Sequence, residues 1–270
     1  MRIFESLCNA ALHFLGFFRQ AVRQHPAGLI LVGAVVAGNS ALAACGDAPA
    51  PGVNWTGCDK SGVDLSGVDL SGATLAKVNL SRANLTRARL RNVDLGFSNL
   101  TGAVLRSARV LDSYLVGATL SKADFTGASL AGSRIARADA SNARFVDANL
   151  AEVELYDTVL RGADFSRANL FKANLTGADL TAAEFTGAKL VRATLSRARL
   201  ERTRFVDAVL ERAKLDRTLV FETDFTRANL RRADFYRAEI SDAVFIDAVL
   251  DSASWVNRER CRFGSVGQCL

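Results

Sequence analysis

The chain has 270 residues, of which 49% are hydrophobic, 8% aromatic and 23% charged. This apolar content excludes an intrinsically disordered chain and is sufficient for a packed core. The formal net charge of +6 is a mild basic excess, compatible with anionic partners but too small to identify one.

The first 43 residues predict a helical signal peptide or membrane anchor. An uncharged apolar run at residues 27–37 follows a basic leader, and residues 41–43, Ala-Leu-Ala, have the small-x-small pattern that precedes a cleavage site. We therefore expect cleavage after Ala43 and export to the periplasm or the exterior.

Two alternatives keep the protein at a membrane. Leu42-Ala43-Ala44-Cys45 resembles a bacterial lipobox, so that lipid on Cys45 would tether the chain. The apolar run would otherwise remain as an uncleaved anchor, although it is short for a hydrocarbon layer of about 30 Å.

Removal of the leader changes the chemistry open to the chain. Both histidines, His13 and His25, lie in it, and without them neither a Ser-His-Asp nor a Cys-His arrangement is available, nor the common zinc sites that use histidine. We expect no catalytic residues, no metal site and no cofactor. The remaining balance is 31 basic against 27 acidic residues, or +4.

Four cysteines remain after the leader is removed, in two close pairs. In an exported protein we expect disulfides between Cys45 and Cys58 and between Cys261 and Cys269, each closing a short loop at one end. Free buried cysteines or a metal clip are the alternatives.

From Ser61 onward the sequence falls into blocks of five, such as Ser-Gly-Val-Asp-Leu at residues 61–65 and Thr-Arg-Ala-Asn-Leu at residues 226–230. Every fifth position from Leu65 to Trp255 is apolar, and the position two residues earlier is almost always small. Phenylalanine recurs among the central positions at steps of twenty from Phe125 to Phe245. This period predicts four repeats per coil, with Phe stacked on Phe along one side of the core.

The pattern resembles the pentapeptide-repeat family, with the motif A(D/N)LXX, over roughly residues 53–255. The resemblance implies an all-β fold, a right-handed quadrilateral parallel β-helix in which the central residue and the small residue point inward. About ten coils at roughly 4.8 Å each would give a solenoid of about 45 to 50 Å with no interior room for a ligand.

A solenoid needs caps because its end coils expose backbone and core. We expect an N-terminal cap at residues 44–60, the solenoid at residues 61–255 and a C-terminal cap at residues 256–270. The terminal loop is expected to cover three apolar residues of the last coil. These residues are otherwise the interface of a homodimer formed through an end of the solenoid. They are Val244, Ile246 and Val249.

A basic stripe is predicted in the C-terminal half, where residues twenty apart stack at two corners of one side. It is the candidate site for an anionic polymer, a lipid headgroup or an acidic protein. The alternative is a solvated face neutralised by Glu201, Glu211 and Asp216. Nucleic acid is a weaker candidate, since Tyr236 alone is placed to stack among the arginines. The stripe consists of Lys172, Arg192, Arg197, Arg212, Lys214, Arg217, Arg232 and Arg237.

Acidic residues such as Asp164, Asp179 and Asp234 occupy a repeat position at which Asp commonly bonds nearby backbone, so we do not expect them to catalyse.

The sequence thus favours a non-enzymatic exported scaffold that binds a protein or an anionic envelope component. The family resemblance offers an alternative, a cytoplasmic DNA mimic that modulates DNA gyrase. The export leader and the net positive charge depart from that pattern.

Overall fold

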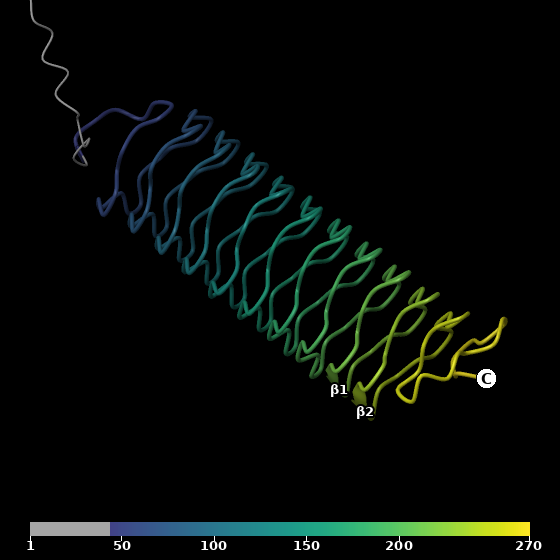
Figure 1. Cartoon of the computed structure of the whole chain (residues 1–270). Coiled ribbons are helices and arrows are strands. Elements are labelled where there is room, and N and C mark those ends of the chain that lie inside the picture. Colours follow the sequence, from purple (N-terminus) through teal and green to yellow (C-terminus); the bar gives the residue numbers. More distant parts are fainter. Residues whose placement is uncertain (1–43) are drawn as a thin grey trace, which may run out of the picture. The chain divides into compact units, whose positions relative to one another are not determined.

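The computed structural model of the protein describes residues 44–270 (Figure 1). The predicted signal or anchor segment, residues 1–43, lies outside the described residues. Figure 1 shows the described chain as successive coils stacked along one axis. Within this part, no helix is long and apolar enough to cross a membrane.

Each repeat contributes one turn and one bridge to the neighbouring coil. The N–H of Cys58 donates to the carbonyl of Trp55 at 3.0 Å. The same hydrogen bond, from an N–H to the carbonyl of the repeat centre three residues earlier, recurs along the solenoid. The residue before each centre forms a parallel bridge to the residue twenty positions later, from Asn54 with Thr74 to Asp234 with Ser254. The predicted parallel solenoid with four repeats per coil is therefore confirmed, and its right hand stays a prediction.

Longer strands occur at one place in the described chain. Strands β1 (Leu219–Phe221) and β2 (Glu239–Ser241) pair in parallel with Val220 opposite Ile240. Elsewhere a turn every five residues leaves each side of the coil too short for more than a single bridge. Bridging begins at Asn54, inside the segment expected as the N-terminal cap.

The core is a column of central residues lined by small ones. Rings of successive central phenylalanines from Phe125 to Phe225 stack at centroid distances of 4.7 to 5.2 Å, and Phe245 continues the stack at 5.1 Å. This confirms the predicted stack. It also measures the rise of one coil at about 5 Å, close to the usual spacing between paired strands.

The two ends are closed in different ways. At the N-terminal end the Lys60 ammonium group lies 4.1 Å from the Trp55 ring centre and donates to the Cys45 carbonyl at 2.7 Å. At the C-terminal end Val266 bridges Val249 in antiparallel fashion, and the Leu250 N–H donates to the Ser265 carbonyl at 2.9 Å.

The terminal loop covers less of the last coil than the sequence predicted. Val249 is half-buried under it, but Val244 and Ile246 remain 39% and 61% exposed. The prediction was wrong for these two residues because the loop bonds residues 248–254, the final part of the coil, and leaves its earlier side open.

Candidate binding surface

Seven of the eight predicted cations occupy the second residue after a repeat centre. The backbone there has a positive φ, for example 60° at Arg192 and 58° at Arg212, as the third residue of a type II turn requires. Glycine takes this conformation without steric cost and does so at Gly177 and Gly187. Arginine adopts a positive φ only at a steric cost, so the backbone conformation does not explain why arginine recurs at this position in successive coils.

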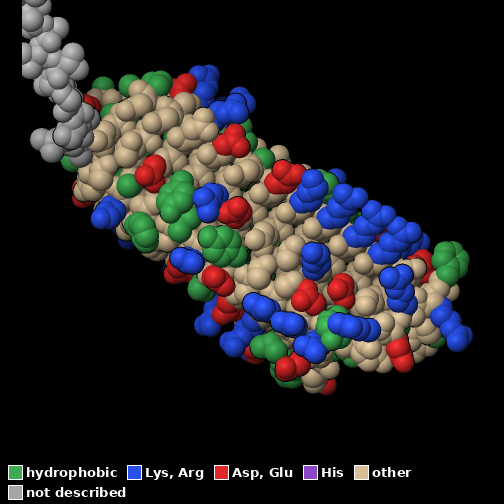
Figure 2. All heavy atoms as spheres, viewed as in Figure 1, with side chains coloured by type: hydrophobic (Ala, Val, Ile, Leu, Met, Phe, Trp, Pro, Cys, Tyr) green, Lys and Arg blue, Asp and Glu red, His purple; other side chains and the backbone are tan. Residues whose placement is uncertain are grey.

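Stacking of the coils arranges these cations into two straight rows. The first row is Lys172, Arg192, Arg212 and Arg232, and the second row is Arg197, Arg217 and Arg237. Lys214 lies on the side between them, bridged to Thr194 and Asp234. We call this side with its two rows the basic face. All eight cations are exposed, and Figure 2 shows Lys and Arg side chains aligned along the C-terminal half.

Few carboxylates neutralise the basic face. Lys172 pairs with Glu152 at 3.1 Å, and Arg212 lies 3.7 Å from Glu211. Among the residues that the structure describes, the other six cations have no carboxylate oxygen within 4.0 Å. These six are Arg192, Arg197, Lys214, Arg217, Arg232 and Arg237.

The acids expected to neutralise the stripe mostly engage other groups. Glu201 pairs with Arg202 at 2.8 Å, outside the basic face, and Asp216 accepts a hydrogen bond from the Ser196 hydroxyl. Only Glu211 lies against a member of the stripe. Of the three acids named in the solvated-face alternative, one therefore neutralises a cation of the stripe, and that cation is Arg212.

A different corner shows what neutralisation looks like in this fold. There acids and arginines share the turn position as two pairs separated by Gly187, and we call Asp147, Arg167, Asp207 and Arg227 the alternating row. Arg167 donates to both carboxylate oxygens of Asp147 at 2.7 Å, and Arg227 does the same to Asp207 at 2.6 and 2.7 Å. These hydrogen bonds lower the pKa of both carboxyl groups. The first and second rows lack such alternation.

Aromatic side chains border the basic face and carry cations on their rings. Arg137 lies 5.8 Å from the ring centre of Tyr156, and Lys172 lies 5.1 Å from that of Phe171. Tyr236 has two arginines over its ring, at 5.0 and 4.2 Å. Of these rings, the sequence predicted a role for Tyr236 alone. Tyr156 lies four whole coils before Tyr236, so the step of twenty would have placed it on the same line as Tyr236.

The family of the chain follows from its repeats. The sequence model described as Pentapeptide repeats matches in eight copies, which together cover residues 52–219 and 221–254. The chain belongs to the pentapeptide repeat family.

Solved structures of other pentapeptide repeat proteins resemble this one. HetL, which is involved in heterocyst differentiation regulation in the cyanobacterium Nostoc sp., is 30% identical, with a TM-score of 0.57 over 78% of this chain and 92% of HetL. QnrB1, a plasmid-mediated fluoroquinolone resistance protein, is 16% identical over 59% of this chain and 85% of its own, with a TM-score of 0.37. A search of the curated proteins found no match.

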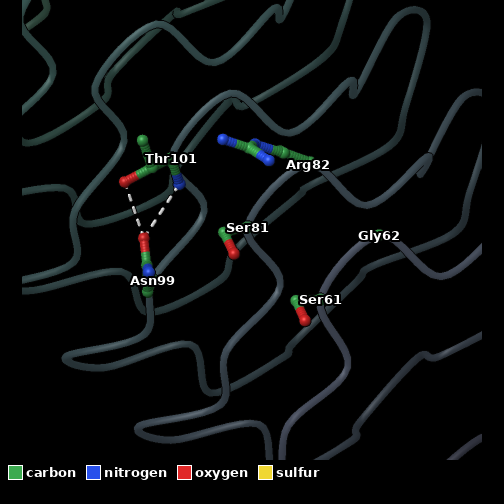
Figure 3. A pocket seen from close by; sticks show the side chains of 6 residues that line it. All are labelled: Ser61, Gly62, Ser81, Arg82, Asn99 and Thr101. Carbon is green, nitrogen blue, oxygen red and sulfur yellow. Dashed lines mark hydrogen bonds between the residues drawn. The ribbon is translucent and has the colours of Figure 1, made fainter.

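The surface hollows of this pentapeptide repeat protein are open and built from repeat residues. One of them, about 430 Å³, is lined by six residues including Ser81, Arg82 and Asn99. Figure 3 shows the Asn99 amide oxygen accepting from the backbone N–H and the hydroxyl of Thr101, at 3.0 and 2.6 Å. Across the described residues no group of His, Cys, Asp or Glu is arranged to hold a metal ion.

Acidic residues at the repeat position serve the backbone, as the sequence predicted. Asp164, Asp179 and Asp234 each accept a hydrogen bond from the N–H two residues later, at 3.0 to 3.1 Å. Burial would raise the pKa of Asp179, but hydrogen bonds from Thr181 and Arg161 outweigh it and lower the pKa. A general acid at neutral pH needs the opposite shift.

The four cysteines outside the leader lie in the expected pairs. Cys45 and Cys58 have Cα atoms 5.5 Å apart, and Cys261 and Cys269 have theirs 4.8 Å apart, each with the sulfurs joined. Both pairs lie outside or at the edge of the paired coils, where a crosslink closes an end without interrupting the core.

Proposed function

We propose that this pentapeptide repeat protein is a non-enzymatic binding scaffold that works after export and holds an anionic envelope component against its basic face. The observation that carries the proposal is the pair of cation rows, in which six charges have no carboxylate partner in the described chain. Like charges about 5 Å apart repel one another unless an anion lies between them.

The export part of the proposal is supported by the leader and by the cysteine pairs, which suit an oxidising compartment. A periplasmic or secreted location is the first choice, and a membrane-tethered form the second. The two forms differ at one atom, because a Cys45 sulfur that carries lipid cannot also bond Cys58.

Intact mass of the protein from fractionated native cells tests the location. A species beginning at Ala44 that gains about four hydrogens on reduction is expected for two disulfides. Lipid on Cys45 would establish the tethered form. A full-length, reduced cytoplasmic species would contradict export and favour a cytoplasmic partner such as DNA gyrase.

Charge reversal tests the binding surface. We expect Arg212→Glu combined with Arg217→Glu to leave the fold intact, because Glu152 and Glu222 already occupy this turn position with φ of 58° and 50°. Binding to anionic vesicles or acidic glycans at low salt should fall roughly 100-fold, given four units of charge near the contact. Unchanged binding to every anionic surface tested would overturn the proposal.

A further inference from the structure

The basic face continues toward the N-terminus as an aromatic surface. Phe97 lies on the same corner as the second row, five coils before Arg197, and Tyr114 lies in line with Lys214, also five coils earlier. Both rings are exposed, Phe97 by 65% and Tyr114 by 39%. One side of the solenoid therefore carries exposed aromatic rings at one end and unpaired cations at the other. Between them on this side lie Arg134, Arg137, Glu154 and Asp157.

Phe97 lies in a strained backbone conformation and is mostly exposed, so its ring buries little apolar surface in the free protein. Its backbone φ is 56°, a conformation that bulky side chains rarely adopt, and most of its side chain faces water. Its ring reaches the next coil, where a Cβ added to Gly117 would be 2.6 Å from Phe97 Cε1 and 2.7 Å from Cδ1. Glycine at residue 117 leaves room for this edge of the ring, and the exposed remainder is available to another flat, apolar surface.

Other rings on this side carry cations, and Tyr114 is one of them, with Arg134 5.9 Å from its ring centre. Tyr236 carries Arg237 and Arg258 over its ring, and Phe171 carries Lys172. Single-stranded nucleic acid requires open ring faces beside the groups that bind its phosphates. Here the exposed Phe97 ring lies about five coils, or about 25 Å, from the unpaired cations, so the arrangement does not suit stacked bases.

The spacing and geometry of the rows suit an extended acidic polysaccharide. The rows are straight and repeat at each coil, that is every 4.7 to 5.2 Å. In an extended β-1,4-linked polyuronate each sugar carries one carboxylate and advances the chain by nearly that distance. Successive sugars are turned over, so their carboxylates point alternately to the two sides, and each of the two rows would meet one carboxylate at every second coil. The apolar faces of pyranose rings stack on exposed aromatic rings.

We propose that the basic face, with Phe97 and Tyr114, binds an extended acidic polysaccharide of the polyuronate type laid along the solenoid axis. This inference rests on the proposed function and names its ligand class. The track from Phe97 to Arg237 spans seven coils, about 35 Å, and would hold about seven or eight sugars. Shorter chains contact either the rings or the cations, and longer ones contact both.

The test is titration of the full exported chain with polymannuronate oligomers of increasing length by isothermal calorimetry. We expect affinity to rise up to about eight sugars and then to level off, as an added contact in one molecule requires. Carboxyl-reduced polymer of the same length should bind roughly 100-fold more weakly or not at all. Equal binding of the neutral polymer would overturn the proposal.

Matched variants locate the site. Arg212→Asn with Arg217→Asn removes two charges from the basic face, and Arg167→Asn with Arg227→Asn removes two from the alternating row at the same turn position, where Asn is well tolerated. The first pair should weaken polymannuronate binding roughly 30-fold and the second less than about threefold. Equal losses in both pairs would mean a non-specific response to net charge and would overturn the site.

Phe97→Asn tests the aromatic end. Long oligomers should lose about tenfold in affinity, while trimers, which reach only one end, should bind as before. No change with long oligomers would remove Phe97 from the site.

Two further probes separate this inference from the proposed function. If vesicles of phosphatidylglycerol and phosphatidylcholine bind through Arg212 and Arg217 but polymannuronate does not, the polysaccharide is wrong and the anionic scaffold stands. If neither binds, both fail. Tighter binding of oligothymidylate than of polymannuronate at equal charge and salt would overturn the ligand class in favour of nucleic acid.

Discussion

The alternating row and the first row occupy the same backbone position in the same kind of turn, yet their electrostatics are opposite. Arg167 and Arg227 each bind an aspartate one coil earlier through two hydrogen bonds. Arg192 and Arg212 each have a cation on both adjacent coils of their own row. In this fold the order of charges at steps of twenty decides whether a corner neutralises itself or stays open to a partner.

If the rows differ only in surface charge, stability must come from the core that they share. Phe165→Ala empties one layer of the ring stack, in which Phe165 lies 4.8 and 4.7 Å from its two neighbours. We expect a loss of about 3 to 5 kcal/mol in the free energy of unfolding by urea. A loss below about 1 kcal/mol would show that the stack is not the main support.

Overpacking of the core should destabilise the protein equally beneath both rows. Ala168 follows Arg167 and Ala193 follows Arg192, and both are fully buried. Ala168→Leu and Ala193→Leu should each overpack the core and destabilise it by about 1 to 3 kcal/mol in the same urea experiment. A clear difference between the two would mean that the rows influence the interior.

Lowering the pH should change stability by a smaller amount, through the carboxylates of the alternating row. The arginine partners lower the pKa of Asp147 and Asp207 in the folded protein, so their contribution to stability is present above the unfolded value near 4. It is lost as the pH falls through the lower folded pKa. Asp147→Asn with Asp207→Asn should remove this part of the pH dependence of the melting temperature. An identical acid profile would contradict the role of these pairs.

The smallest effect on stability should come from converting one row into the other. Arg212→Asp places an acid between Arg192 and Arg232 and so copies the alternating order. We expect almost no change in the free energy of unfolding, since exposed ion pairs contribute little. Binding of anionic vesicles should nevertheless fall roughly 30-fold. Unchanged binding would show that the row is not the contact.

The sequence predicted everything that depends on the period. Steps of five and twenty define the centre, the stack of rings from Phe125 to Phe245 and the backbone bonds of Asp164 and Asp179, because these follow from backbone position alone. The side-chain partners could not be read in the same way. Glu201 lies near the stripe in sequence yet pairs with Arg202, because the choice among carboxylates within reach depends on rotamers.

The predicted cover of the last coil was wrong in part, for a similar reason. The cysteine pair at Cys261 and Cys269 indicated a closing loop, but no repeat governs where a loop outside the array lies. It bonds the final part of the last coil, and Ile246 stays exposed. Most of the aromatic border of the basic face was not predicted, because the stripe was defined by charges, and not by rings, at steps of twenty.

The coil of four repeats also sets the unit in which the protein can change length. Removing residues 181–200 would delete one whole coil and leave every later side chain in its former column, with Phe205 over Phe165. Removing residues 181–185 would turn all later repeats onto the next side, so that Phe165 would meet Leu190 and Lys172 would be followed by Arg197. Insertions and deletions of twenty residues therefore keep every face in line, whereas those of five rotate all later faces by one side relative to the earlier coils.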